Sequence, residues 1–91
     1  MKVKVRFFAY FREIFRAKEI DLELSGPVLA RHVFFQIADT PERRSELFSS
    51  GRLKPHVVVL RNGAPLPAAT GLDTLLDEGD TLSIFPISGG G

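Results

Sequence analysis

Alternating apolar and polar residues predict two β-strands near the start of the chain. Over residues 2–10 the odd positions are apolar and the even positions are mostly polar, which is the period of a half-buried strand. Phe8 is the exception, because it places an aromatic ring on the otherwise polar face. A second alternating run covers residues 18–24, and we expect residues 11–17 to connect the two strands as a hairpin.

The next periodic segment predicts one main helix. Ser25, Gly26 and Pro27 are typical of a helix start, because proline already has the backbone angle of the first helical position. Pro41 ends this helix, since the residue before a proline is pushed out of the helical region, and residues 41–48 predict a second short helix. Between these limits runs an apolar stripe at helical spacing, made of Leu29, Ala30, Val33, Phe34, Ile37 and Ala38.

Short elements separated by turns are predicted for the second half of the chain. Asn62 and Gly63 favour a tight turn directly after a β-branched run, since both residues tolerate positive φ. In the last strand the alternation turns Phe85 outward. The predicted elements are a strand at 56–60, at most a short edge strand within 64–69, one helical turn at 72–76 and a last strand at 81–86.

This order of elements predicts an α+β fold with a mixed sheet packed on one main helix. A first hairpin, a helical crossover and a final strand describe a β-grasp arrangement, in which the first and last strands pair. Ninety-one residues leave no room for a second core. We expect one domain over residues 1–86, followed by a flexible glycine tail at residues 87–91.

Composition narrows the possible functions. A formal net charge of +1 argues against nucleic acid or an anionic membrane as the main partner, because both require a concentrated basic surface. The absence of cysteine excludes a thiol nucleophile and a thiolate metal site within the chain. No apolar run approaches the roughly 20 residues of a membrane span, and no secretory leader is recognisable, so we expect a cytoplasmic protein.

No metal site is predicted. His32 and His56 each lack a second ligand at metal-binding spacing. Asp77, Glu78 and Asp80 crowd one short segment, but this segment lacks the spaced oxygen ligands of a calcium loop. A solvated turn is therefore the favoured interpretation of these three acidic residues.

The chemically distinctive segment is the tail, where Ile87 and Ser88 precede Gly89, Gly90 and Gly91. One interpretation is a frayed end, since ordering three glycines loses more backbone entropy than ordering any other sequence. The other is a reactive arm, because a tail without side chains can thread a narrow tunnel and present an unhindered carbonyl. A free carboxylate has a poor leaving group, so a reactive arm would require nucleotide activation by a partner; the chain has no phosphate-binding loop of its own.

Two motifs carry a resemblance to a known family. Residues 3–13, VKVRFFAYFRE, and residues 76–86, LDEGDTLSIFP, resemble the beginning and the end of the molybdopterin synthase small subunit family, the MoaD/ThiS-type ubiquitin-like sulfur carriers. The Asn62-Gly63 turn and the final Gly90-Gly91 pair also fit this family. Ile87-Ser88 departs from the Pro-Val sequence that is common at this place.

The resemblance implies a β-grasp fold, as in ubiquitin, and a role in sulfur transfer. The Gly91 carboxylate would be adenylated by an E1-like adenylyltransferase and converted to a thiocarboxylate with sulfur from a sulfurtransferase. The tail, with Gly90 and Gly91 at its reactive end, would then enter the large subunit of molybdopterin synthase and donate sulfur in molybdenum cofactor biosynthesis. The chain would bind no cofactor itself, since the activating partner uses the ATP, and would be a non-catalytic sulfur donor rather than an enzyme alone.

A docking patch is predicted beside the tail. If the first and last strands pair, Phe8 and Phe85 lie on neighbouring strands and point to one solvent face. Aromatic anchors dominate interface energetics, so we predict partner contacts by both rings. Pro86, Gly89 and Leu66 are predicted to contribute to the same surface. The alternative is that the two rings belong to the core.

Other functions fit the same tail. The protein could carry sulfur for thiamine synthesis or tRNA thiolation, or it could be a protein modifier joined through Gly91 to lysine side chains. A third alternative is a non-catalytic β-grasp interaction module with unreactive glycines. The sequence alone does not separate these alternatives.

Overall fold

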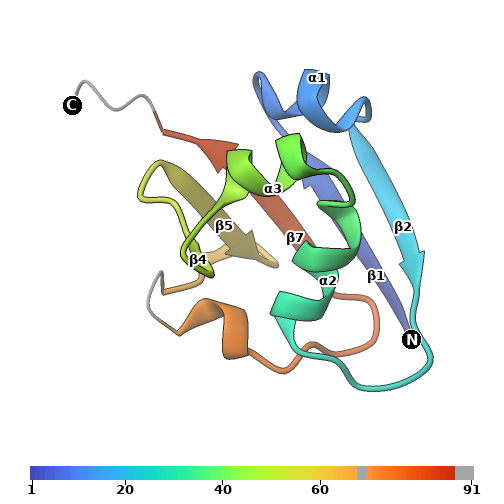
Figure 1. Ribbon diagram of the computed structural model, residues 1–91. Helices are drawn as coiled ribbons and strands as arrows, with labels where there is room; N and C mark the ends of the chain where they lie inside the picture. The colour runs from blue at the N-terminus through green and yellow to red at the C-terminus, as the bar shows by residue number, and fades with distance from the viewer. Residues whose placement is uncertain (68–69, 88–91) are drawn as a thin grey trace.

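The computed structural model describes residues 1–67 and 70–87, which form one layer of sheet and one layer of helices (Figure 1). In chain order the elements are β1 (Lys2–Phe7), α1 (Phe11–Phe15), β2 (Glu19–Glu23), α2 (Ala30–Ile37), α3 (Pro41–Leu47), β3 (Phe48–Ser49), β4 (Arg52–Leu53), β5 (Val57–Arg61), β6 (Ala64–Pro65), a 3-10 turn η1 (Gly71–Asp73) and β7 (Thr81–Pro86).

A five-stranded mixed sheet organises the fold, in the order β2-β1-β7-β5-β6. Its central pair, β1 and β7, is parallel, with Val5 opposite Leu82, and the other pairs are antiparallel. Parallel neighbours need a crossover connection, and the segment that contains α2 supplies it. The predicted α+β fold, with the first and last strands paired, is confirmed.

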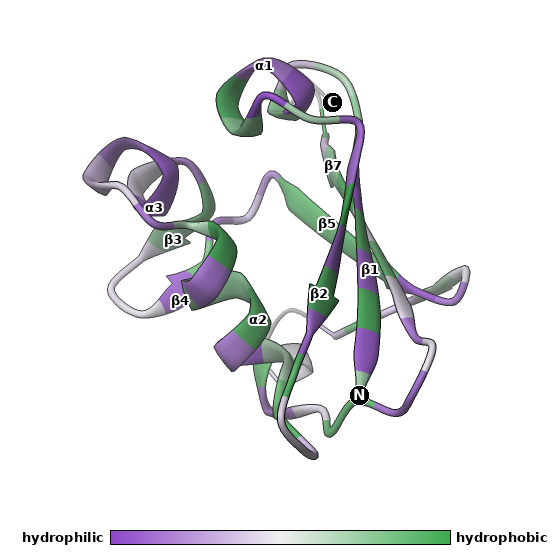
Figure 2. Ribbon diagram, turned by 90° about the vertical axis from the view of Figure 1, so that its right-hand side faces the viewer, coloured by the Kyte–Doolittle hydropathy of each residue, from purple (hydrophilic) through white to green (hydrophobic). Residues whose placement is uncertain are grey.

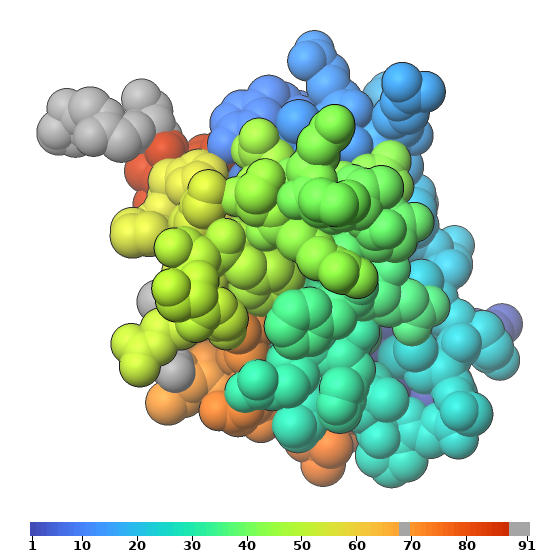
Figure 3. All heavy atoms as spheres, viewed as in Figure 1, coloured from blue at the N-terminus to red at the C-terminus, as the bar shows by residue number. Residues whose placement is uncertain are grey.

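The helices α2 and α3 lie on one side of this sheet (Figure 2), and their side chains cover it in the space-filling view (Figure 3). The core fills the space between them, because Val33 and Phe34 of α2 and Leu82 and Ile84 of β7 are all fully buried. Each such side chain stabilises the fold by about 1.5–3 kcal/mol through removal of apolar surface from water. The predicted helical stripe is therefore the helix contribution to the core, with Leu29 only half-buried at its start.

The prediction that residues 11–17 connect the first two strands as a hairpin is confirmed by the antiparallel pairing of β1 and β2, but the connection contains a helix that was not predicted. Phe11–Phe15 form the short helix α1, because the two phenylalanines lie four positions apart and are both buried on one side of the turn. Ala9 before the helix and Arg16 after it have φ angles of 54° and 55°. These left-handed residues bend the chain sharply into and out of α1.

The main helix begins at Ala30, later than Pro27 predicts. Leu29 forms an isolated β-bridge with Leu75, and the Ala30 N–H donates to the Thr74 carbonyl at 2.8 Å. These tertiary hydrogen bonds hold the chain extended up to the helix start. The second helix, α3, lies within its predicted range.

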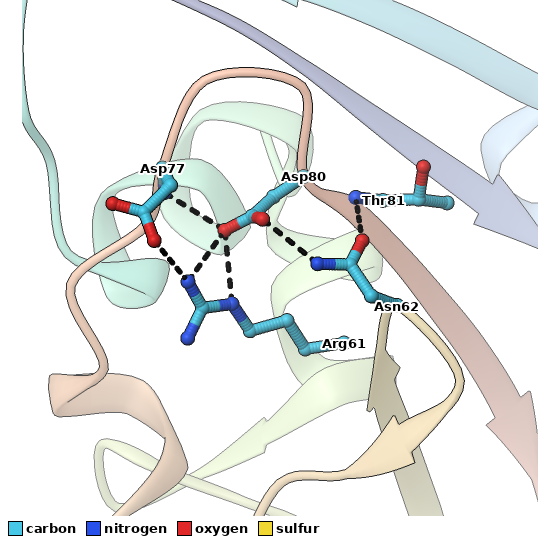
Figure 4. A network of polar contacts seen from close by, with 5 residues as sticks. All are labelled: Arg61, Asn62, Asp77, Asp80 and Thr81. Atoms are coloured by element: carbon cyan, nitrogen blue, oxygen red, sulfur yellow. Dashed lines mark hydrogen bonds and ion pairs between the residues drawn. The ribbon is translucent and has the colours of Figure 1, made fainter.

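A polar cluster around the buried Asp80, which we call the Asp80 corner, joins the start of β7 to the end of β5 (Figure 4). Asp80 is 5% exposed and accepts hydrogen bonds from Arg61 Nε at 2.9 Å, Asn62 Nδ2 at 2.9 Å and the Asp77 N–H at 2.8 Å. Burial by itself would raise the pKa of Asp80, but these donors and the Arg61 charge outweigh it and hold the pKa below its usual value. The prediction that this acidic segment is a solvated turn is wrong for Asp80.

The Asn62-Gly63 turn is confirmed, with φ angles of 51° and 86° at its two residues. Asn62 has a second role, because its Oδ1 accepts from the Thr81 N–H at 2.9 Å while its Nδ2 donates to Asp80. The turn residue thus fixes the register of β7 against β5.

Candidate functional site

The tail leaves the domain at the end of β7, where Val57 of β5 faces Pro86. The Ile87 N–H donates to the His56 carbonyl at 2.7 Å, which extends the ladder one residue beyond the strand. We call His56, Pro86 and Ile87 the tail base. The predicted site residues Gly89, Gly90 and Gly91 lie outside the residues that the structure describes.

Phe8 and Phe85 meet beside the tail base. Their rings stack with centroids 4.3 Å apart and an angle of 21° between the planes. The parallel pairing of β1 and β7 brings them together, because the Phe8 N–H donates to the Ile84 carbonyl at 3.2 Å. The predicted proximity of the two rings is confirmed.

This aromatic pair lies on the face of the sheet that the helices leave open. In β7 the side chains of Leu82 and Ile84 are buried beneath the helices, whereas Phe85 alternates with them and is half-buried. Neither ring belongs to the buried core cluster, which counts against the core-packing alternative. Register places three further half-buried or exposed apolar residues on the same face, and we call the whole set the docking face: Phe8, Phe85, Val58, Leu60 and Pro65.

Two arginines add positive charge to the docking face. The guanidinium carbons of Arg6 and Arg12 each lie 5.4 Å from the centroid of the Phe8 ring, a cation–π distance. Arg12 is held there because its Nε donates to the Phe7 carbonyl at 2.9 Å. Arg6 also forms an exposed ion pair with Glu19 at 3.7 Å, which contributes little stability. The face thus combines an apolar surface with cationic side chains at one side.

Leu66 does not join the docking face, so that part of the prediction is wrong. The Leu66 N–H donates to the Val59 carbonyl at 2.9 Å, which places Leu66 opposite a strand residue that points into the core. Its side chain is half-buried and packs against the core cluster. A Cβ atom added to Gly71 would lie only 3.0 Å from the Leu66 Cβ, so η1 covers this leucine closely.

The structure adds two residues that the sequence did not single out together. The Tyr10 hydroxyl lies 3.0 Å from His56 Nε2, although the two residues are 46 positions apart. The Tyr10 pKa is raised above 10.0, first by partial burial and then by the negative charge of Glu46, so the phenol keeps its proton at neutral pH. No periodicity could have paired these residues, because only the folded sheet brings them together.

The part of the chain covered by the structure holds neither a candidate metal site nor a helix that could span a membrane. Within these residues no three His, Cys, Asp or Glu side chains gather in a way that could hold a metal ion. None of the helices described is long and apolar enough to cross a bilayer.

Known proteins with a similar sequence and a similar fold match this protein over nearly its whole length. The ThiS family matches residues 5–91. The small archaeal modifier protein 3 of Haloferax volcanii is 36% identical, and the alignment covers all of both chains. The solution structure of the HVO 2177 protein from the same organism has a TM-score of 0.84 at 35% identity, covering 100% of this chain and 87% of the other.

A further structural neighbour is a putative molybdopterin converting factor subunit 1 from Pyrococcus furiosus. It has a TM-score of 0.76 at 27% identity, covering 97% of this chain and 99% of the neighbour. The predicted β-grasp fold is confirmed by these matches together with the strand order of the sheet. The chain belongs to the ThiS family of ubiquitin-like sulfur carriers and modifiers.

Proposed function

We propose that this protein carries sulfur as the small subunit of a molybdopterin synthase. An E1-like adenylyltransferase would use ATP to adenylate the Gly91 carboxylate, which releases pyrophosphate and supplies the leaving group that a carboxylate lacks. A sulfurtransferase would then deliver sulfur at the sulfide level; its attack on the acyl carbon would break the bond to AMP and form the thiocarboxylate, and a persulfide donor would need a second thiol to cleave the acyl disulfide formed first. The tail would donate that sulfur to a pterin precursor within the large subunit.

The observation that carries the proposal is the stacked Phe8–Phe85 pair on an open sheet face directly beside the tail base. A carrier must present its end to another protein's active site, so its docking surface has to lie where the tail departs. The chain itself does two things in this scheme: it docks through an apolar face and holds the root of the tail in a fixed direction. The chemistry belongs to the partners.

The docking face also indicates what the partners look like. Half-buried aromatic rings fit an apolar partner surface, and Arg6 and Arg12 beside Phe8 fit carboxylates next to that surface. The same face would serve the adenylyltransferase, the sulfurtransferase and the synthase large subunit in turn, since only one tail is available. All of these steps use ATP or reduced sulfur species, which is consistent with a cytoplasmic setting.

A second function has its own support. The relative from Haloferax volcanii is called a modifier protein, and it matches the whole chain at 36% identity. A protein modifier would use the same adenylated Gly91, but a lysine amine rather than a sulfur nucleophile would displace AMP. The neighbour from Pyrococcus furiosus, a putative molybdopterin converting factor, supports the sulfur-transfer proposal instead.

Intact mass after coexpression with an adenylyltransferase and a sulfurtransferase tests these functions. A sulfur carrier gains the mass difference between one sulfur and one oxygen atom, and a modifier forms amide-linked adducts with other proteins. An unchanged mass with no adducts would leave only an interaction module.

The molybdenum assignment needs a second assay, in which the thiocarboxylated protein and a synthase large subunit convert the pterin precursor. If a thiazole precursor is sulfurated and the pterin precursor is not, the pathway is that of thiamine.

A further inference from the structure

The last backbone hydrogen bond before the tail depends on a residue outside the strands. Ile87 donates to the carbonyl of His56, which precedes β5 and lies in a turn. This turn has one backbone bond of its own, from the Val57 N–H to the Lys54 carbonyl at 2.9 Å. The acceptor that holds the tail base therefore needs some further restraint to stay in place.

The side chain of His56 supplies that restraint. Its Nε2 lies 3.0 Å from the Tyr10 hydroxyl, which connects the turn before β5 to the turn before α1. The phenol keeps its proton, and its hydroxyl and His56 Nε2 lie at hydrogen-bond distance, with the donor set by the tautomer of the histidine ring. The contact joins two segments 46 positions apart in the sequence, beside the end of β7.

Tyr10 is itself well anchored. Its ring packs on the ring of Phe11 with centroids 4.8 Å apart, and Phe11 is fully buried. Its carbonyl accepts the Glu13 and Ile14 N–H groups at 3.0 and 3.1 Å and so begins α1. The helix α1 and the end of β7 lie at the same end of the sheet (Figures 1 and 2). A continuous path of contacts therefore runs from the core through Tyr10 and His56 to Ile87.

We propose that Tyr10 and His56 are positioning residues that hold the tail base and fix the direction in which the tail leaves the domain. This inference rests on the proposed function, because direction matters only if the tail enters a partner. Without the Tyr10–His56 contact, the turn that carries the His56 carbonyl loosens and Ile87 loses its hydrogen bond. The partner must then order one more backbone residue when the tail enters.

Fixing one backbone residue costs an amount equivalent to roughly a tenfold change in affinity. We therefore expect Tyr10→Phe to raise the KM of the carrier for its adenylyltransferase about tenfold, with kcat within about twofold of wild type. Tyr10→Phe keeps the ring on Phe11, so the fold is retained. His56→Ala should act in the same way, and His56→Gln, which keeps an acceptor, should recover part of the loss.

Two measurements separate positioning from a general structural effect. Amide hydrogen exchange should become faster at Ile87 in Tyr10→Phe and stay unchanged at the β1–β7 ladder, for example at Phe8 and Leu82. The double variant Tyr10→Phe/His56→Ala should raise KM no more than His56→Ala alone, since His56→Ala already removes the contact with Tyr10 together with the ring contact between His56 and Phe11. His32→Gln, a substitution of the histidine on α2, serves as the matched control and should leave both the KM and the Ile87 exchange rate unchanged.

The proposal is overturned if Ile87 exchanges equally fast in wild type and Tyr10→Phe, if exchange accelerates without a rise in KM, or if the two substitutions add in the double variant. If the wild-type protein is never adenylated, the proposed function fails. The exchange measurement still decides whether Tyr10 and His56 hold the tail base, so the two failures are distinguishable.

Discussion

The two ends of β7 are built in opposite ways. At its start, Asp80 is 5% exposed and receives three hydrogen bonds from two other segments of the chain. At its end, Ile87 is 52% exposed, and among the residues that the structure describes it has one backbone bond, to a residue in a turn. The start of β7 is therefore held by several hydrogen bonds, whereas few of the described contacts hold its end.

This difference separates stability from function along a single strand. The Asp80 corner fixes β7 against β5 and, through the Lys4 N–H that donates to the Asp80 carbonyl at 2.9 Å, against β1. A strand fixed in this way can present its far end in a constant direction even though that end makes few contacts. Substitutions at the Asp80 corner should therefore reduce stability, and substitutions near the tail base should reduce transfer.

The largest functional loss is expected from removal of Gly90 and Gly91. This deletion should abolish thiocarboxylate formation, because the carboxylate would no longer reach the nucleotide, while the denaturation midpoint stays at the wild-type value. Stability should be retained because, within residues 1–67 and 70–87, the last member of the buried core along the chain is Ile84. Intact mass after coexpression with the activating enzymes measures the first effect, and a urea titration measures the second. A deletion variant that still gained sulfur would contradict the role of the tail.

The largest stability loss is expected from Asp80→Ala. This substitution removes the acceptor of the Asn62 amide and of Arg61 Nε, leaves Arg61 only its exposed partner Asp77, and should destabilise the fold by about 3 kcal/mol. Chemical denaturation measures the change, and Asp21→Ala, on the exposed edge of β2, is the control with an expected effect below about 0.5 kcal/mol. At a temperature where the variant is fully folded, its sulfur uptake should equal that of wild type. A loss of uptake there would mean that the two ends of β7 are not separate in function.

Some helices and strands of this fold could be predicted from the sequence pattern and others could not. The strands β1, β2, β5 and β7 follow from alternation and β-branched content, because each has one face on the core and one facing away. The helix α1 was missed because five residues are too few to show a helical period. The hairpin of β3 and β4 was missed because two-residue strands show no alternation. The late start of α2 depends on the Leu29–Leu75 bridge, which joins residues far apart in the sequence.

Within the candidate site, local pattern was sufficient for Phe8 and Phe85 but not for the long-range polar contacts. Asp80 is buried because Arg61 and Asn62, 19 and 18 positions away, reach its carboxylate. Leu66 is different, because the sequence was sufficient to predict which face of the sheet its side chain occupies. A two-residue turn at Asn62-Gly63 sets Leu60 opposite Pro65, and one step further Leu66 must share the inward face of Val59.

A smaller, selective effect is expected at the docking face. Phe85→Ala removes one of two stacked rings and should weaken binding of the adenylyltransferase or the synthase large subunit by about 2 kcal/mol, or roughly 30-fold. Phe35→Ala is the matched control, because Phe35 is also a stacked aromatic, 4.9 Å from Phe48, but lies on α2 away from the docking face. Titration calorimetry with the unloaded carrier measures both. Equal weakening by the two substitutions would remove the argument for a docking face beside the tail base.

The smallest effect concerns pH and belongs to the Asp80 corner alone. The folded state lowers the Asp80 pKa, so the unfolded chain binds the proton more readily and Asp80 contributes stability above its ordinary pKa near 3.8. This contribution should disappear as the pH falls from about 4 through the lower pKa of the folded state. In Asp80→Asn the part of the acid-induced stability loss that is due to this carboxylate should be absent, which denaturation midpoints between pH 6 and pH 2.5 can measure. Because Asp80 lies at the other end of β7, the Ile87 amide exchange rate at each of these pH values should be the same in wild type and Asp80→Asn. If Ile87 responded to the protonation of Asp80, β7 would transmit the state of one end to the other, and the separation of stability from tail direction would have to be abandoned.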